Sequence, residues 1–372
     1  MKNVLCEHVK SYVDCYQFAY TKKRSVEDAV LTLSDFVLKH VEQANNLYKK
    51  HFVKILFVDF SSAFNTIQPH LMMQKLNNMK VNPYIILWIN QFLTARLQYV
   101  KYLGTQSDMI ITNTGAPQGC VLSPLLFTLY TSDCRCNGQN TQLFKYADDT
   151  ALVGRCVNTD VNYRNEVTHF VNWCESNYLE LDVQKTKEMI IDFQKSPAEH
   201  IPLCINNENV EIVKEYKYLG TIIDNSFNFN KNVDVIFKKT QSRMYFVRQL
   251  IKLKINVKIL NLFYSSILQS VICFSIVCWY GNCSVDSKLK LSRVIRNCEK
   301  LGVMDTIPLQ DLYEKFMVQR SKMICSDNSH PLCQYYKMLP SGKRYQSIRC
   351  RTSRYMKSFL PSSIRIMNKL CI

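Results

Sequence analysis

Glycine, proline and repeated sequence are scarce in this 372-residue chain. It contains 9 Gly and 10 Pro, and no low-complexity segment or internal repeat is visible. This scarcity excludes the collagen-like, linker-rich and disordered classes, which are defined by an excess of such residues. With 47% hydrophobic and 21% charged residues the composition is globular, and the length allows two or three packed units.

The sequence also lacks a secretory signal and a disulfide framework. No basic segment followed by an apolar one opens the chain, and the 16 Cys have no small-domain spacing. We therefore expect reduced cysteines and an intracellular location, nuclear or cytoplasmic. The uncharged run 259–280 is long enough to span a bilayer, but its recurring Ser, Asn and Gln favour a buried helical pair, and we expect no membrane partner.

Acidic residues are the scarcer charged class. The chain has 30 Asp and Glu against 47 Lys and Arg, a net charge of +17. Residues 287–372 hold 17 of the basic residues and 5 of the acidic ones, so the excess is concentrated there. Such an excess favours a polyanionic partner through electrostatic steering and counterion release, and nucleic acid is the first candidate.

The apolar spacing predicts both helices and strands. Residues 25–28 have the pattern of a capping box, so a helix is expected from Val26 to the low forties. The apolar run 54–58 predicts a buried strand that delivers Asp59 at its end. The pattern becomes helical and basic after Asn230, where we place a domain boundary. Other expected elements are helices over 69–79, 84–94, 123–129 and 161–177, a hairpin over 100–114, and strands over 189–193 and 218–223.

Two acidic residues lie between two short strand patterns, 143–146 and 150–153, which predicts a β-hairpin with Asp148 and Asp149 at its tip. Adjacent carboxylates repel each other unless a cation neutralises them. Together with Asp59 they form an all-oxygen ligand set, which suits Mg²⁺. Two such ions about 4 Å apart would activate a 3′-hydroxyl and hold a leaving pyrophosphate. An Asp-Asp pair alone is more often a solvated turn.

The order of three motifs favours a catalytic role for Asp148 and Asp149. FVDFSSAF at 57–64, GAPQGCVLSP at 115–124 and YADD at 146–149 resemble the ordered motifs of the reverse transcriptase domain of LINE-type (non-LTR) retrotransposons, in the jockey-like and fish-element branch. The resemblance covers most of the chain. It implies an α+β fold with a right-hand polymerase palm, and it divides the chain into partial fingers, palm, an all-α thumb and a basic C-terminal region, at 1–50, 51–230, 231–285 and 286–372.

The resemblance also implies an activity, RNA-directed DNA polymerase, with an RNA template, a DNA primer and dNTPs as partners. Asp59, Asp148 and Asp149 would be catalytic residues and the ligands of two Mg²⁺ ions, with Mn²⁺ as the alternative ion. Lys185 or Lys187 would donate a proton to the departing pyrophosphate. A solvated pair of lysines is the alternative for these two residues.

Further residues would contact substrate or template by the same resemblance. Phe64 lies where the family places a steric gate against a ribose 2′-hydroxyl, and its alternative is an ordinary core aromatic residue. Gln118 would lie near the templating base, and Gly119 would let the backbone approach nucleic acid closely. Phe60 and Tyr146 would line the same site.

Two basic clusters are candidate nucleic-acid contacts. The loop cluster consists of Lys22, Lys23 and Arg24. The tail cluster contains no acidic residue and consists of Lys343, Arg344, Arg349, Arg351, Arg354 and Lys357, interleaved with Tyr345 and Tyr355. Cations for phosphates and aromatic faces for bases are typical of single-stranded nucleic-acid binding. A solvated loop and a solvated tail are the alternatives.

The chain also departs from the family. Only 16 residues precede the part that resembles it, where family members carry an endonuclease and the first finger strands. We therefore expect no DNA nicking and an incomplete grip on triphosphate, which leaves a non-catalytic nucleic-acid-binding relic as the alternative function. Residues 233–281 also resemble an N-terminal segment of an AlkB-type repair homologue, and an accessory domain of that kind is the weakest alternative, because the facial triad of an iron oxygenase is not recognisable.

Overall fold

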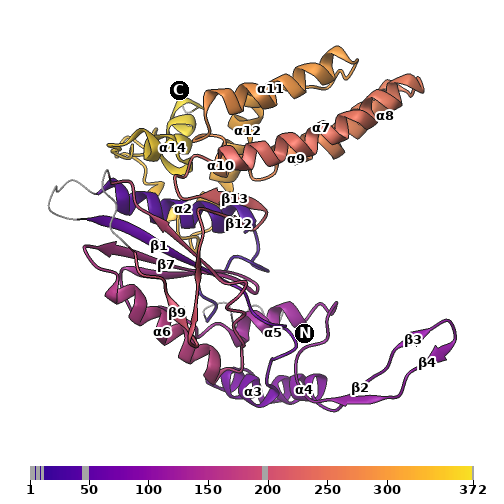
Figure 1. The fold of residues 1–372 in the computed structure, drawn as a ribbon, viewed down its shortest axis with the longest axis vertical. Helices are drawn as coiled ribbons and strands as arrows, with labels where there is room; N and C mark the ends of the chain where they lie inside the picture. The colour runs from indigo at the N-terminus through magenta and orange to yellow at the C-terminus, as the bar shows by residue number, and fades with distance from the viewer. Residues whose placement is uncertain (1–4, 6–8, 10–11, 44–49, 195–199, 371–372) are drawn as a thin grey trace. The chain divides into compact units, whose positions relative to one another are not determined.

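The computed structural model describes residues 5, 9, 12–43, 50–194 and 200–370 (Figure 1). The chain forms two compact units, and each is assembled from separate stretches of sequence. The first unit contains Met1–Arg24, Lys54–Glu188 and Ala198–Ile212, and the second contains Ser25–Val53, Met189–Pro197 and Val213–Ile372. The four regions predicted along the chain stay a prediction, because each unit draws on several of them.

A five-stranded sheet with the order β11-β8-β1-β7-β6 carries the predicted catalytic strands. Its strands are β1 (His51–Val58), β6 (Thr141–Tyr146), β7 (Asp149–Val157), β8 (Lys187–Ile191) and β11 (Glu211–Ile212). β1 is central and buried along nearly all its length, as its apolar run predicts. β6 and β7 are antiparallel, as expected for the predicted hairpin, whereas β11 pairs with β8 in parallel, so the sheet is mixed. The long segment between β8 and β11 permits this crossover.

One helix covers the sheet within the first unit. Helix α6 (Val161–Ser176) packs against β7, and a Cβ atom at Gly154 would lie 2.5 Å from the ring of Tyr163. Only glycine therefore allows this helix and strand to approach so closely. The other helices that the structure describes at full length in this unit are α3 (Pro69–Asn78), α4 (Pro83–Leu93) and α5 (Ser123–Tyr130), close to the predicted ranges, and each has a proline in its first turn.

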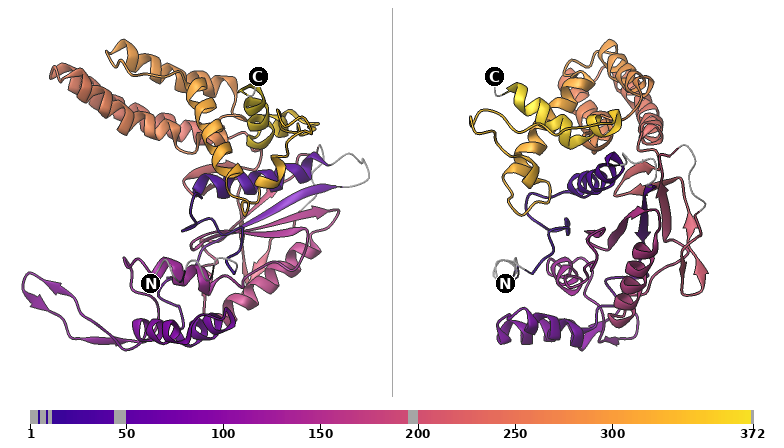
Figure 2. Two further views of the ribbon diagram at one scale, coloured as in Figure 1. Left: turned by 180° about the vertical axis from the view of Figure 1, so that it is seen from behind. Right: turned by 90° about the vertical axis from the view of Figure 1, so that its left-hand side faces the viewer.

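A narrow two-stranded arm extends from the first unit (Figures 1 and 2). It consists of β2 (Arg96–Gln98) paired with β5 (Ile110–Thr112), and of β3 (Lys101–Tyr102) paired with β4 (Thr105–Gln106). The predicted hairpin over 100–114 is therefore confirmed, although its first strand begins earlier in the chain. A short hairpin, β9 (Cys204–Ile205) with β10 (Glu208–Asn209), also belongs to this unit.

One predicted strand is wrong. The range 218–223 is not continuous, because β12 (Glu215–Tyr218) and β13 (Thr221–Asp224) form an antiparallel hairpin. Leu219 and Gly220 have φ values of +47° and +83°, the left-handed pair that a tight two-residue hairpin turn requires. The glycine within the apolar run was the available signal for this turn.

The second unit is mainly helical. The predicted helix after the capping box is confirmed as α2 (Val26–Glu42), and α7 (Asn230–Lys252) begins at the predicted boundary. Helices α7 and α11 run side by side in Figures 1 and 2. The other helical elements are α8 (Val257–Phe263), the π-helical turn Tyr264–Gln269, α9 (Ser270–Cys273), α10 (Ile276–Trp279), α11 (Val285–Lys300), α12 (Leu309–Cys325), the 3₁₀ turn Cys333–Tyr335, α13 (Ser353–Lys357) and α14 (Phe359–Leu370).

One stretch of helices among the described residues, Val257–Trp279, is long and apolar enough to cross a membrane by length and composition alone. Helices in the core of a water-soluble protein meet the same criterion, and 44% of its most apolar part is buried here. Ser275 interrupts the stretch with a φ of +50°. Packed helices rather than a membrane span stay our prediction for it.

Candidate active site

Asp59 is the first residue after β1, as predicted from the apolar run that precedes it. Its N–H donates a hydrogen bond to Thr186 Oγ1 at 3.3 Å, and its carbonyl oxygen accepts one from the N–H of Asp182 at 3.0 Å. The next turn of chain is held in the same way, because the Ser61 N–H donates to the Glu180 carbonyl at 2.9 Å. The backbone of Asp59 is therefore fixed on one side while its side chain stays 40% exposed.

The predicted acidic hairpin is confirmed. Tyr146 and Asp149 face each other as the last pair of β6 and β7, so Ala147 and Asp148 form a two-residue turn. Asp148 lies at the tip, and Asp149 is the first residue of β7. Because β1 and β7 are neighbours in the sheet, Asp59 and the acidic pair come from adjacent strands.

Asp149 is affected by the two other acids. The pKa of Asp149 is raised to about 6, first by loss of water around its carboxylate and then by the negative charges of Asp148 and Asp59. The residue as a whole is exposed, so the repulsion acts at an accessible site. Among the described residues no three His, Cys, Asp or Glu side chains are arranged as a ready metal cage. The three acids are therefore close enough to repel one another without converging on one point.

A lysine lies beside these acids. Lys185 Nζ is 2.8 Å from Asp182 Oδ2 and 3.6 Å from Asp59 Oδ2. The hydrogen bond and charge of Asp182, and then the charge of Asp59, raise the pKa of Lys185, so it carries a positive charge at neutral pH. Lys187, the other candidate, instead pairs with Glu211 at 2.7 Å. Of the two lysines, only Lys185 approaches a predicted metal ligand.

The glycine-rich turn lies against the residues that follow Asp59. Gly115 N–H donates to the Ile67 carbonyl at 2.7 Å, and Ala116 N–H donates to the Phe64 carbonyl at 2.9 Å. A Cβ atom at Gly115 would lie 2.7 Å from the backbone of Asn65, and its φ is +72°, so glycine is required there.

The predicted template contacts occupy the same turn. Gln118 is exposed, and its Nε2 donates to Asn65 Oδ1 at 3.3 Å. Gly119 has a φ of +80° and open space where a side chain would begin. The first two motifs are thus joined by hydrogen bonds, while the surface of the turn stays accessible.

The three predicted aromatic contacts come from two places in the unit: Phe60 and Phe64 follow β1, and Tyr146 ends β6. The ring of Phe64 is 4.8 Å from that of Phe127, and the ring of Phe60 is 6.4 Å from that of Phe170. Phe60, Phe64 and Tyr146 are all half-buried, so each has one packed and one open side. Their roles toward a nucleotide stay predictions.

The two basic clusters differ in how many of their charged groups are exposed to solvent. In the loop cluster, Lys22 and Lys23 are exposed, whereas Arg24 donates from Nη1 to the Cys15 carbonyl at 2.5 Å and lies over the ring of Phe18. Arg24 therefore has a structural role within its own loop. Contact of this cluster with nucleic acid stays a prediction.

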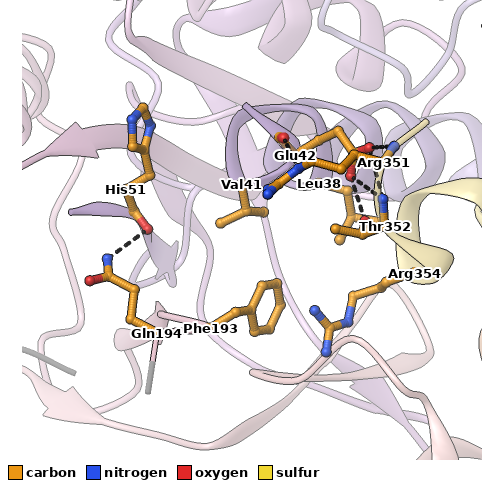
Figure 3. A pocket seen from close by; sticks show the side chains of 9 residues that line it. All are labelled: Leu38, Val41, Glu42, His51, Phe193, Gln194, Arg351, Thr352 and Arg354. Carbon is orange, nitrogen blue, oxygen red and sulfur yellow. Dashed lines mark hydrogen bonds between the residues drawn. The ribbon is translucent and has the colours of Figure 1, made fainter. Parts of the chain in front are cut away.

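Three residues of the tail cluster, Arg351, Arg354 and Tyr355, contact other residues of the second unit. Figure 3 shows Arg351 and Arg354 beside α2: Arg351 Nε donates to the Glu42 carbonyl at 3.2 Å, and Arg354 lies 3.7 Å from the ring centroid of Phe193. Tyr355 is buried and donates to Asp35 Oδ1 at 3.1 Å. The cations that remain exposed in the chain before this contact are Lys343, Arg344 and Arg349.

Sequence reasoning missed two supports of the site. Gln17, far away in the sequence, accepts a hydrogen bond from the Ala147 N–H at 3.3 Å. Lys54, in the strand that leads to Asp59, is fully buried and lies 2.9 Å from Asp160 and 3.6 Å from Glu188. A lysine within an apolar strand was a signal for a buried acidic partner, whereas Gln17 was marked only as the first residue of the segment that resembles the family.

Comparison with known proteins gives the family. Residues 1–223 match the family model described as reverse transcriptase (RNA-dependent DNA polymerase). The chain belongs to the reverse transcriptase family. This membership, together with the acidic hairpin beside the strand that ends at Asp59, identifies the α+β first unit as a polymerase fold with the predicted palm.

The similar curated proteins come from retrotransposons. The chain is 25% identical over 249 residues to the probable RNA-directed DNA polymerase from transposon BS of Drosophila melanogaster, covering 64% of this chain and 27% of that protein. It is 23% identical over 248 residues to the RNA-directed DNA polymerase from mobile element jockey of Drosophila funebris, covering 64% and 26%. The reverse transcriptase chain thus spans about a quarter of the length of these relatives, and the predicted kinship with jockey-like elements is confirmed.

Two further matches carry less weight. The apo telomerase of Candida tropicalis is similar in structure with a TM-score of 0.44 and 13% identity, over 87% of this chain and 57% of that chain. Residues 229–270 match the model described as alkylated DNA repair protein alkB homolog 8, N-terminal. That match covers α7, α8 and the π-helical turn, none of which belongs to the carboxylate site.

Proposed function

We propose that this reverse transcriptase chain catalyses RNA-templated DNA synthesis, joining dNTPs to the 3′-hydroxyl of a DNA primer. The observation that supports this most directly is that Asp59 follows one strand of the sheet while Asp148 and Asp149 lie on the hairpin of the adjacent strand. Acidic residues that are only solvated surface residues are not expected to lie together on adjacent strands, because their proximity raises the electrostatic energy. A polymerase site needs this arrangement to bind cations.

Reverse transcriptases generally use divalent metal ions. The ligand set offered here fits such ions, since it consists of carboxylate oxygens whose repulsion a cation would relieve. We propose Mg²⁺ as the ion, bound as a pair by Asp59, Asp148 and Asp149, with Mn²⁺ able to replace it. When bound, the ions would supply the positive charge that activates the primer hydroxyl and stabilises the leaving pyrophosphate.

Three side chains would contact the nucleotide, the template and the pyrophosphate. The open side of Phe64 would restrict the sugar pocket, and the exposed Gln118 would contact the template at a turn already fixed to the strand end. Lys185 would place a positive charge next to Asp59. Because its pKa is raised, it holds its proton firmly at neutral pH. This favours electrostatic stabilisation of the pyrophosphate over easy proton donation.

Primer extension on an RNA template with dNTPs and Mg²⁺ tests the proposal. Asp59→Asn and Asp148→Asn are each expected to abolish extension without unfolding the protein, because each removes a charge that the ions require. Asp133→Asn is the matched control: it removes an exposed acid of the same unit that pairs with Lys75, and it should leave extension intact.

Two results would count against the proposal. Extension by Asp148→Asn at the rate of the parent would show that this carboxylate does not bind a catalytic ion. A parent that binds primer and template but extends neither RNA- nor DNA-templated primers would instead support the non-catalytic nucleic-acid-binding alternative.

A further inference from the structure

The turn that presents Asp148 is held from outside the hairpin. Gln17 is buried, and its side-chain Oε1 accepts hydrogen bonds from the N–H of Ala147 at 3.3 Å and of Ala19 at 3.1 Å. Because both partners are backbone N–H donors, they determine which amide atom is the oxygen. The opposite atom, Gln17 Nε2, is buried without a hydrogen-bond partner among the described residues. The side chain is thus oriented entirely by its acceptor oxygen.

The residue that Gln17 holds is conformationally strained. Ala147 has a φ of +59°, in the left-handed region that a residue with a Cβ atom rarely adopts. Such a conformation persists only where surrounding contacts enforce it. The Ala147 side chain is buried, so the turn cannot relax by swinging outward without exposing it. A hydrogen bond to the N–H of this residue acts directly on the strained position.

The segment that carries Gln17 is itself firmly attached to the hairpin. Phe18 N–H donates to the Lys145 carbonyl at 2.9 Å, and Lys145 N–H donates to the Tyr16 carbonyl at 3.0 Å, which forms a parallel bridge. The buried Lys145 Nζ lies 3.3 Å from Asp14 Oδ2. Gln17 therefore reaches the turn from a fixed base within the first unit.

We propose that Gln17 is a positioning residue for the catalytic turn: through the Ala147 N–H it enforces the strained conformation that presents Asp148 for binding divalent ions. Gln17 is buried and acts on the site through the backbone of Ala147. The inference rests on the proposed function in one respect, that these carboxylates bind metal. Its test uses metal affinity, which is measured without polymerisation.

Titration of Mn²⁺ by electron paramagnetic resonance is the main measurement. Gln17→Met keeps the length of the side chain and removes the acceptor, and we expect Mn²⁺ affinity to fall by about fivefold, the effect of one neutral hydrogen bond. Adding Ala147→Gly should restore most of the loss, because glycine adopts positive φ without strain. The same pattern is expected for the Mg²⁺ concentration that gives half-maximal primer extension, with little change in the KM for dNTP.

Glu166→Met is the matched control. Glu166 is also buried, and its carboxylate accepts hydrogen bonds from two backbone N–H groups, of Asn137 and Gly138, near the other end of β6. Its replacement should lower the melting temperature and leave Mn²⁺ affinity unchanged. Gln17→Glu, which keeps an acceptor oxygen, provides a second test if Gln17→Met does not fold, and it should lose no affinity.

Four results would overturn the proposal. They are Mn²⁺ affinity at the parent level in Gln17→Met, failure of Ala147→Gly to restore it, an equal loss in Glu166→Met, and a loss of affinity in Gln17→Glu. A parent that binds Mn²⁺ but extends no primer would refute the proposed function alone, and the comparison of variants would still decide the role of Gln17. A parent that binds no Mn²⁺ would overturn both.

Discussion

Replacing Lys54 by Met tests how the strand that carries Asp59 is held in place. The Lys54 side chain is 0% exposed, and its Nζ lies 2.9 Å from Asp160 Oδ2 and 3.6 Å from Glu188 Oε1. The Glu188 side chain is also 0% exposed, whereas Asp160 is partly solvated. Methionine fills a similar volume, so the substitution removes the positive charge while creating little empty space. The buried carboxylate of Glu188 then lacks its main cation, Lys54.

The expected loss of stability in Lys54→Met follows from the burial of Glu188. Removing one partner of a buried ion pair costs about 3–5 kcal/mol, because the other charge stays desolvated. Burial already raises the pKa of Glu188, and Lys54 offsets part of that rise. Without Lys54 the pKa of Glu188 rises further, and protonation then limits the loss. We expect the free energy of unfolding at pH 7.5 to fall by about 3 kcal/mol, which lowers the melting temperature of the first unit by roughly 6–12 °C.

The pH dependence has a definite sign. A carboxyl group whose folded pKa is raised stabilises the fold below its unfolded pKa, and this stabilisation is lost as pH rises through the folded pKa. The deficit of Lys54→Met relative to the parent should therefore shrink as the pH falls from 7.5 toward 5. Urea denaturation followed by circular dichroism at the two pH values measures it.

Two further variants complete the test. Lys54→Met with Glu188→Leu should be more stable than Lys54→Met alone, since the uncompensated charge is gone. Lys290→Met is the control, because Lys290 pairs with Asp234 at 2.6 Å on the surface, and such pairs contribute about 0–1 kcal/mol. A loss in Lys54→Met no larger than in this control, or a double variant less stable than the single one, would refute the reasoning.

Three other predictions concern the site and its charges. Lys185→Met should slow the single-turnover rate of primer extension by about 10²-fold, the effect of removing one group that stabilises developing charge. Lys185→Arg keeps a fixed positive charge and should retain most of the rate, so an equal loss in both variants would contradict the electrostatic role. The pKa of Asp149 is raised to about 6. Mn²⁺ affinity should therefore decline as pH falls through 6, while the melting temperature of the metal-free protein rises. If neither quantity changed with pH, the proposed repulsion among the acids would be contradicted. Lys343, Arg344 and Arg349 are the exposed tail cations that precede the contact with Glu42. Replacing these three by Ala should reduce the slope of log affinity for RNA against log salt by about 2, whereas an unchanged slope would show that they do not contact phosphate.

Local pattern was sufficient to predict the acidic hairpin and the strand before Asp59. Alternating or continuous apolar residues determine which stretches are buried as strands, and a two-residue gap that contains acids determines the turn. The same reasoning failed at 218–223, where apolar residues on both sides of Gly220 suggested one strand and the left-handed pair at 219–220 makes two. The parallel strand β11 also escaped prediction, because two residues carry no periodic signal.

Contacts between distant parts of the sequence were beyond local reasoning. The hydrogen bond from Ala147 to Gln17 joins residues that are 130 positions apart, and neither residue type suggests the other. The tail illustrates a different limit. The run of basic residues and tyrosines predicts contacts with nucleic acid for all of them, but Arg354 lies over the ring of Phe193 and Tyr355 is buried against Asp35. Arginine and tyrosine combine a polar end with a surface that packs well, so composition alone does not tell which part of them is used.

The site combines groups that repel with backbone that is held from several directions. Electrostatic repulsion among the acids would move them apart if their backbone were loose, and this would weaken any later binding of cations. Here the backbone of Asp59 is bound to the segment around Asp182, and the turn of Asp148 is bound to Gln17. Lys185 offsets part of the negative charge on the side of Asp59. It follows that substitutions of Gln17 and of Lys185 should act mainly through metal affinity, and only secondarily through overall stability.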